Sequence, residues 1–215
     1  MIQVAESLNA VVSRIAGDIR CRGYAQFSAT DPVEHKQIVA RLGPVLHRTR
    51  VSIRPEGRTY LSRAEAVPFH TDHPNVAVIS WRCEAQDAGD GASLLVDAVA
   101  AIDALDPPTA NALATVRMPC PDLLGLTRSH CRVLWEPSTR QVFFAPWLLP
   151  EGVTDSQRIA LGALRDAIER AAVATRLRFR LDPGQCLAID NRRMLHGRGP
   201  VHDGSTRTLE RIWIG

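Results

Sequence analysis

The chain has 215 residues, of which 45% are hydrophobic and 23% charged, and its formal net charge is +3. This composition is typical of globular proteins and excludes a disordered chain. A chain of this length can bury a core without disulfides or a structural metal, so we expect one domain spanning residues 1–215. The small net charge gives no support to a nucleic-acid partner.

Neither a membrane span nor a secretory leader is predicted. The longest apolar run, residues 93–105, is interrupted by Asp97 and Asp103 and is too polar to cross a bilayer. Residues 4–20 have the spacing of an amphipathic helix rather than of a signal peptide. The five cysteines include no Cys-x-x-Cys pair, which argues against a disulfide framework or a zinc ribbon. We therefore expect a cytoplasmic protein.

The hydrophobic pattern predicts helices outside and short strands inside. Helices are predicted at residues 4–20, 31–42, 98–105, 109–116 and 155–174. Strands are predicted at residues 24–27, 76–81, 93–96, 177–181, 186–190, 193–196 and 207–214, with a hairpin pairing 131–135 with 141–144. Because strands and helices do not alternate as in βαβ units, the pattern favours an α+β fold with an antiparallel core.

Histidine, carboxylate and arginine residues are concentrated in three stretches. The first contains His70 and Asp72, which share one face if this segment is a strand. The second is an apolar strand that ends with His196. The third carries Arg207 and Arg211 on one strand face. These residue types at this spacing indicate a metal site with a neighbouring anion site.

Two histidines and one carboxylate on one face of a metal form the facial triad of non-haem Fe(II) oxygenases. Three protein ligands leave three coordination positions, which suffice for a cosubstrate that binds through two atoms and for O₂. A cosubstrate with a distant carboxylate also needs a fixed cation. Arg207 follows His196 on the next predicted strand and is well placed to provide it.

The sequence resembles the taurine dioxygenase and clavaminate synthase group of Fe(II)/2-oxoglutarate-dependent oxygenases. The resemblance rests on four stretches in the family's order: PFHTDHP, GDGASLLVDA, LDPGQCLAIDNRRMLHGR and STRTLERIWI. It implies a distorted double-stranded β-helix, or jelly roll, with flanking helices. It also implies an enzyme that couples oxidative decarboxylation of 2-oxoglutarate to hydroxylation of an unactivated C–H.

The resemblance also implies roles for individual residues. His70, Asp72 and His196 would bind Fe(II) and form the catalytic centre. Arg207 and Ser93 would hold the distant carboxylate of 2-oxoglutarate. The candidates for substrate contacts are Arg211, from the resemblance, and Tyr60 and Ser62, from their place just before the first histidine.

The expected substrate is a small amino acid or another anionic metabolite, free or carrier-tethered, as in secondary metabolism. Desaturation or ring formation would use the same residues. Relatives in this family are commonly longer and have insertions that cover the substrate. We therefore expect a site that is more open, or one that a second subunit closes in a homo-oligomer.

Two other functions stay open at this point. A zinc hydrolase could use the same His/Asp/His set, but it would need a general base beside the metal-bound water and would leave Arg207 without a role. A non-catalytic jelly roll could bind a small carboxylate, but it would have no need for three metal ligands.

We expect mainly structural roles for the other histidines and for the tryptophans. His73 follows Asp72 and points to the opposite face, so it is not counted as a ligand. Trp147 is expected in the core like the other tryptophans, and its position after Pro146 also makes it a candidate to line the pocket. The core is expected to hold Trp81, Trp135 and Trp213, and hydrogen-bonding or surface roles are expected for His35, His47, His130 and His202.

Overall fold

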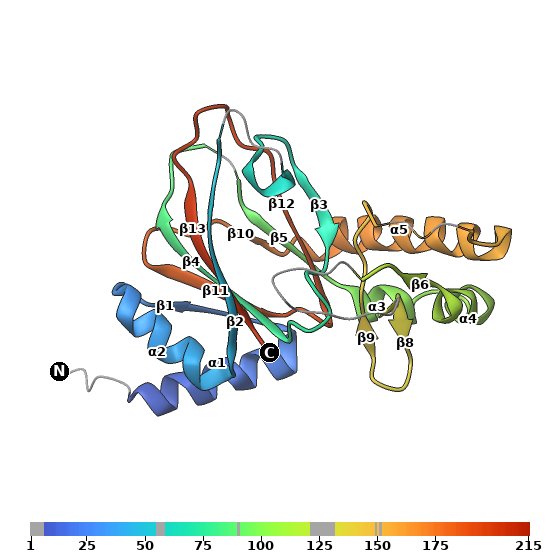
Figure 1. The fold of residues 1–215 in the computed structure, drawn as a ribbon, viewed down its shortest axis with the longest axis horizontal. Coiled ribbons are helices and arrows are strands. Elements are labelled where there is room, and N and C mark those ends of the chain that lie inside the picture. Colours follow the sequence, from blue (N-terminus) through green and yellow to red (C-terminus); the bar gives the residue numbers. More distant parts are fainter. Residues whose placement is uncertain (1–6, 55–58, 90, 121–131, 149, 151) are drawn as a thin grey trace.

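Two antiparallel sheets pack face to face in the computed structural model (Figure 1). The structure describes residues 7–54, 59–89, 91–120, 132–148, 150 and 152–215, and only the backbone of Tyr60, Arg132 and Val133. The first sheet contains, in order across it, β1 (Tyr24–Ser28), β11 (Gln185–Asp190), β4 (Val78–Ala85), β13 (Thr208–Ile214) and β2 (Val45–Ser52). The second contains β10 (Arg178–Phe179), β5 (Ser93–Asp97), β12 (Met194–Arg198) and β3 (Val67–His70).

Apolar side chains from both sheets meet in the space between them. This core includes Ile79, Trp81, Leu95, Leu187, Ile189, Met194, Leu209 and Trp213. Alternate residues of each strand point inward, as antiparallel sheets with one buried face require. The predicted α+β class and jelly-roll core are confirmed.

Helices cover the outer faces of the two sheets (Figure 1). The five-stranded sheet is covered by α1 (Leu8–Arg22) and α2 (Pro32–Leu42), whose Ile15, Ile19 and Ile38 pack on β1 and β11. The four-stranded sheet is covered by α3 (Ala98–Asp103), α4 (Pro107–Thr115) and α5 (Asp155–Thr175). Two short ladders pair β6 (Arg117–Met118) with β7 (Arg132–Val133), and β8 (Trp135–Glu136) with β9 (Gln141–Val142).

Local sequence signals set the helix ends. Gly23 ends α1 in the left-handed conformation at φ 82°, and its N–H donates to the carbonyl of Ile19. Asp31 caps α2 by accepting a hydrogen bond from the N–H of Val33 at 2.8 Å. Thr154 caps α5, because its side chain accepts a hydrogen bond from the N–H of Gln157.

Some boundaries differ from the prediction. Helix α4 begins at Pro107 rather than at residue 109, because Asp106 accepts a hydrogen bond from the Thr109 N–H and so caps the helix. Strand β4 begins at Val78 rather than at residue 76, because the N–H of Val76 donates to the carbonyl of His73 in a turn. The predicted start of the first helix at residue 4 lies outside the described residues, as do Asp90, His130 and Cys131.

The two faces of β13 have different surroundings. Glu210 points toward α2, where its carboxylate lies 3.2 Å from Nδ1 of the buried His35. The other ring nitrogen of His35 lies 2.9 Å from the Ser80 hydroxyl. Burial lowers the pKa of His35, and the contact with Glu210 opposes this effect in part. Leu209 and Arg211 lie on the opposite face of β13, which looks into the space between the sheets.

None of the helices in the described ranges is long and apolar enough to cross a membrane. No disulfide joins the cysteines within these ranges.

Gly197 lies where β12 and β3 approach closely, and an added Cβ would lie 2.7 Å from the carbonyl oxygen of Val67. Because β3 would have to shift, we expect Gly197→Ala to lower the free energy of unfolding by about 1–3 kcal/mol. Denaturant unfolding measures this. The matched control is Gly162→Ala on α5, where the added Cβ meets no atom within 4 Å. Equal losses in the two variants would contradict the close approach.

Candidate metal centre

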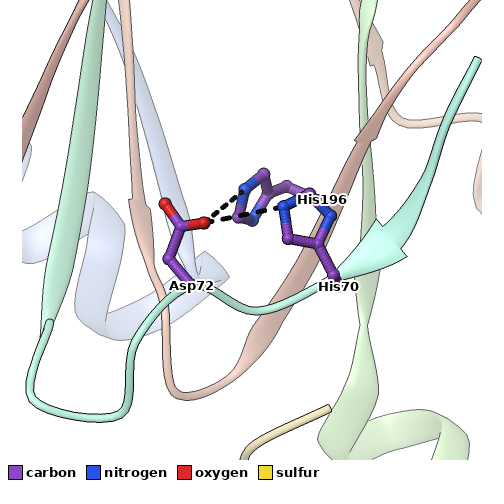
Figure 2. A group of neighbouring side chains, drawn as sticks. All are labelled: His70, Asp72 and His196. Carbon is purple, nitrogen blue, oxygen red and sulfur yellow. Dashed lines mark ion pairs between the residues drawn. The ribbon is translucent and has the colours of Figure 1, made fainter. Parts of the chain in front are cut away.

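His70, Asp72 and His196 form a compact cluster between the two sheets (Figure 2). Their potential ligand atoms all lie within 4.8 Å of one another. Oδ1 of Asp72 is 3.6 Å from Nε2 of His70 and 3.8 Å from Nε2 of His196. The three side chains are only 4%, 8% and 8% exposed. Residues that the sequence placed in one site are therefore brought together.

The backbone brings these residues together in two ways. His70 and His196 lie directly opposite each other on the antiparallel strands β3 and β12. Asp72 was expected on the same strand as His70, and this expectation is wrong because β3 ends at His70. The N–H of Thr71 leaves the sheet and donates to the carbonyl of Phe144 at 2.8 Å. Asp72 thus reaches the histidines from a loop.

Hydrogen bonds hold this loop on two sides. The hydroxyl of Thr71 accepts a hydrogen bond from the N–H of Phe144 at 3.0 Å. The N–H of Asp72 donates to Oδ1 of Asn191 at 2.8 Å, and the amide of Asn191 donates to the carbonyl of Val76 at 2.9 Å. Asn191 is 1% exposed and lies in the turn before β12. The turn that precedes His196 therefore also fixes the backbone of Asp72.

Two donors from β13 hold the second carboxylate oxygen of Asp72. Nε1 of Trp213 donates to Oδ2 at 2.7 Å, and Nη1 of Arg211 donates to the same oxygen at 3.1 Å. Burial would raise the pKa of Asp72, but Arg211 and the two histidines hold it well below its usual range. The carboxylate is therefore ionised at neutral pH, and Oδ1 is the oxygen that faces the histidines.

The surroundings of the two imidazoles suit metal binding. Nδ1 of His70 donates to the carbonyl of Pro68 at 2.8 Å, which directs Nε2 toward the cluster. Burial, followed by the proximity of His70, lowers the pKa of His196 well below its ordinary value. Neither ring nitrogen of His196 has a hydrogen-bond partner in the part of the chain that is described. Buried polar atoms without partners are rare, and a metal bound to this nitrogen and oxygen donor set would provide a partner for Nε2 of His196.

Aromatic rings flank the two histidines. The ring centroid of Trp81 lies 5.1 Å from that of His196, and the centroid of Trp147 lies 4.8 Å from that of His70. Trp81 and Trp213 are buried, as expected, and Trp135 is buried in the core beside α3, α4 and α5. Trp147 is 40% exposed, so the core position expected for it is wrong, and it lines a cavity at the cluster, which is the alternative position.

A small inner cavity of about 40 Å³ lies on one side of the cluster. His70 and His196 line it together with Arg207 and Ser93, the two residues expected to hold 2-oxoglutarate. Arg198 and Arg211 add two further cationic side chains. The described lining of this inner cavity contains three arginines and no carboxylate, so it favours an anion.

Sequence analysis assigned no role to Arg198. Its Nη2 donates to the carbonyls of Arg63 and Glu65 at 2.6 and 2.5 Å, while Nε and Nη1 have no partner within the described ranges. Burial lowers the pKa of Arg198, and burial followed by repulsion from Arg198 lowers that of Arg207 to about 10. Both side chains stay charged at neutral pH. Alternation along β12 could have identified Arg198, which is two residues after His196 and therefore shares its face.

A larger outer cavity of about 370 Å³ lies on the other side of the cluster. It shares His70, Leu61, Val67 and Arg211 with the inner cavity, and Asp72 lines it. The cluster therefore lies where the two cavities meet.

The residues expected to contact the substrate differ in whether they line the two cavities. Arg211 lines both cavities. The side chain of Ser62 lines neither, because its hydroxyl donates to the carbonyl of Thr59 in the short turn η1 (Tyr60–Ser62). Its neighbours Thr59 and Leu61 line the outer cavity instead. The Tyr60 side chain lies outside the described part of the structure.

His73 is not a member of the metal-ligand cluster. The expectation that it points to the opposite face from Asp72 is wrong, because β3 ends at His70 and both residues line the outer cavity. It is 3% exposed, and its Nδ1 accepts a hydrogen bond from the N–H of Asn75 at 3.1 Å. Its other nitrogen, Nε2, lies 3.6 Å from the Cys120 sulfur.

Comparisons with known proteins agree with this geometry. Residues 127–213 match the family described as taurine catabolism dioxygenase TauD, TfdA family. This range includes His196, Arg207 and Arg211, while His70 and Asp72 precede it. No curated protein sequence matches the chain.

Several solved structures share the fold. An asparagine oxygenase in complex with Fe(II), 2S,3S-3-hydroxyasparagine and succinate superposes with a TM-score of 0.75 at 19% identity, over 96% of this chain and 79% of that one. The non-haem iron oxygenase OrfP with Fe, succinate and (3R,4R)-dihydroxy-L-Arg gives a TM-score of 0.71 at 16% identity, over 97% and 80%. OrfP with Fe and alpha-ketoglutaric acid gives 0.72 at 15% identity, over 96% and 79%. The family match and the shared fold confirm the resemblance seen in the sequence, and the substrate of this chain is a separate question.

Trp213→Phe removes one hydrogen bond to Asp72 while keeping an aromatic ring in place. We expect the variant to bind metal about 10- to 100-fold more weakly, because a donor that orients a ligand is lost. Anaerobic titration with Fe(II) or Co(II) measures this effect, and thermal unfolding of the metal-free protein monitors the fold.

Trp135→Phe is the matched control, since Trp135 is also buried but lies on β8, outside the cluster and both cavities. We expect its metal affinity to equal that of the unmodified protein. If both variants lose affinity equally, the cause is general packing and not the hydrogen bond to Asp72.

Proposed function

We propose that the protein is an Fe(II)/2-oxoglutarate-dependent oxygenase that hydroxylates an unactivated C–H of a small molecule. The observation that carries this proposal is the position of the His70, Asp72 and His196 cluster between a cationic inner cavity and a larger outer cavity. When bound, iron and 2-oxoglutarate would supply the oxidising chemistry, consuming O₂ and releasing succinate and CO₂.

The inner cavity supports binding of the dicarboxylate cosubstrate. Arg207 is 5% exposed, so a carboxylate paired with it is shielded from water and from salt. Ser93 begins β5 and adds a hydroxyl to the same cavity. Arg198 adds a second buried positive charge, which raises the affinity of this cavity for a dianion. We propose Arg207 and Ser93 as the residues that hold the distant carboxylate.

Arg211 has two functions in this proposal. It orients Asp72 through Nη1, and it lines the boundary between the two cavities. Its Nε has no hydrogen-bond partner in the described residues, so it can still donate to an anionic group of the substrate. Roles for Tyr60 and Ser62 in substrate binding stay predictions, and Thr59 and Leu61 are better placed for contact than Ser62.

The proposed substrate is a small amino acid, free or carrier-tethered. The products bound to the asparagine oxygenase and to OrfP are hydroxylated amino acids, which supports this class for a protein of the same fold. The partly exposed Trp147 beside the outer cavity is compatible with a site that is more open than in longer relatives. A homo-oligomeric state and a cytoplasmic location stay expectations from the sequence.

The two alternatives are less well supported. A zinc hydrolase would need a general base beside the metal, and Asp72 is the sole carboxylate in the described lining of the outer cavity. Asp72 is already held by Arg211 and Trp213 and is itself a ligand candidate. A module that only binds a carboxylate would need neither the metal-ligand cluster nor the second cavity.

Anaerobic addition of Fe(II) and then 2-oxoglutarate to the metal-free protein should produce the visible charge-transfer band of the iron chelate. We expect His70→Ala to abolish the band and iron-dependent succinate formation, because one of three ligands is lost. Circular dichroism should show an unchanged fold. Tight zinc binding without a band would favour the hydrolase, and no metal binding would favour the binding module.

Arg207→Ala should raise the 2-oxoglutarate concentration needed for half-maximal turnover by about 10- to 100-fold, because it removes a buried charge-assisted pair. A series of 2-oxoglutarate concentrations at fixed iron measures this change. The control is Arg50→Ala on the neighbouring strand β2, which removes an exposed arginine paired with Glu84. Unchanged 2-oxoglutarate affinity in Arg207→Ala would contradict the assignment.

A further inference from the structure

We infer that the substrate presents an apolar side chain to the metal centre, and that Trp147 is a residue that determines this specificity. The inference rests on the proposed function, because it concerns the substrate of the same site. It follows from the chemical character of the outer cavity and from the hydrogen-bonding state of its polar groups.

Apolar side chains form most of the described wall of the outer cavity. They are Leu61, Val67, Phe143, Ala145, Trp147 and Leu148. The volume of about 370 Å³ lies within the usual range for small-molecule sites. Such a wall favours a substrate that buries hydrocarbon against it.

The charged groups of the outer cavity are already paired with each other. They are Asp72 and Arg211, joined by a hydrogen bond of 3.1 Å. Oδ2 of Asp72 also accepts the indole N–H of Trp213, and Oδ1 faces the two histidines. No further carboxylate lines the described part of the cavity. A cationic side chain such as that of arginine would therefore find no counter-charge there.

The neutral polar groups also have partners. The hydroxyl of Thr71 is bonded to the backbone of Phe144, and that of Thr59 lies 3.0 Å from the Ser62 hydroxyl. Nδ1 of His73 accepts the N–H of Asn75. A substrate amide or hydroxyl placed among these groups would give up hydrogen bonds to water without replacement. The cavity therefore selects against polar side chains as well as charged ones.

The two cavities favour different parts of the ligands: the inner cavity favours carboxylates, and the outer cavity favours apolar groups. Three arginines make the inner cavity suitable for carboxylates, while the outer cavity has a single paired arginine at its boundary. The carboxylate of an amino acid can approach Arg211 at this boundary. The side chain then lies along the apolar wall. This arrangement differs from the polar asparagine and arginine derivatives bound in the two similar oxygenases, which a shared fold permits.

Among the residues of the apolar wall, Trp147 offers the ring on which a substrate side chain could pack. Its ring lies 4.8 Å from that of His70, so a group packed on it lies next to a metal ligand. It is 40% exposed, and a bound apolar group would cover part of this surface.

The test compares amino acids matched in shape but not in polarity: leucine with asparagine, and norleucine with ornithine. Each is offered to the Fe(II)- and 2-oxoglutarate-loaded protein as the free acid and as the N-acetylcysteamine thioester, which mimics a carrier-tethered group. The readouts are succinate formation and, without oxygen, the shift of the visible band on binding.

We expect the apolar member of each pair to have a kcat/KM about tenfold or more above that of its polar partner. Along alanine, norvaline and norleucine, kcat/KM should rise about fourfold for each added methylene. Equal or better use of asparagine or ornithine would overturn the inference. So would a protein that forms the band but binds none of the apolar compounds in either form. Absence of the band itself would instead refute the proposed function.

Variants of Trp147 test its role separately. Trp147→Ala should raise the KM for the apolar substrate about tenfold while the 2-oxoglutarate requirement and the band stay unchanged. Trp147→Phe should recover most of the loss. The control is Ile159→Ala, which removes an exposed apolar side chain from α5, outside both cavities. Equal effects of the two alanine variants, or an unchanged KM in Trp147→Ala, would overturn the assignment.

Discussion

The arrangement of the site depends on how the second oxygen of Asp72 is held. A buried carboxylate is costly unless it is paired, and Oδ2 receives one hydrogen bond from an arginine and one from an indole. Both donors come from β13 in the five-stranded sheet, whereas Asp72 follows β3 of the four-stranded sheet. The same contact therefore joins the two sheets and leaves Oδ1 directed at the histidines. Asn191 and Thr71 complete this constraint by fixing the backbone of the loop.

Strand β13 links the metal-ligand cluster to both cavities. Leu209, Arg211 and Trp213 lie on its inner face, and Arg207 precedes its first residue. Arg207 serves the inner cavity, and Arg211 serves the boundary. The outward face carries Glu210, which meets the buried His35 of α2. A single strand thus connects the proposed cosubstrate site, the carboxylate of Asp72 and the packing of a helix.

Local patterns were sufficient to predict much of this structure. Residue type and spacing predicted that His70, Asp72 and His196 share one site, and the hydrophobic pattern predicted α2 and α5 closely. The departure of Asp72 from β3 was not predictable locally, because it depends on Phe144 and Asn191, which are distant in sequence. The contribution of Trp213 was missed because a tryptophan in an apolar strand is ordinarily a core residue. Its hydrogen bond becomes evident only when the loop of Asp72 is placed against β13.

The two-residue period of β13 also limits how this segment can change during evolution. Deleting or inserting one residue between Arg207 and Trp213 would exchange the two faces of the strand. Glu210 would then turn toward the inner cavity, and Arg211 would turn beneath α2, where His35 lies. A single insertion or deletion would therefore disrupt both the anion site and the packing of α2 on the sheet. Divergence in this segment is therefore restricted to substitution, whereas changes in length are confined to connections such as the hairpin between β8 and β9.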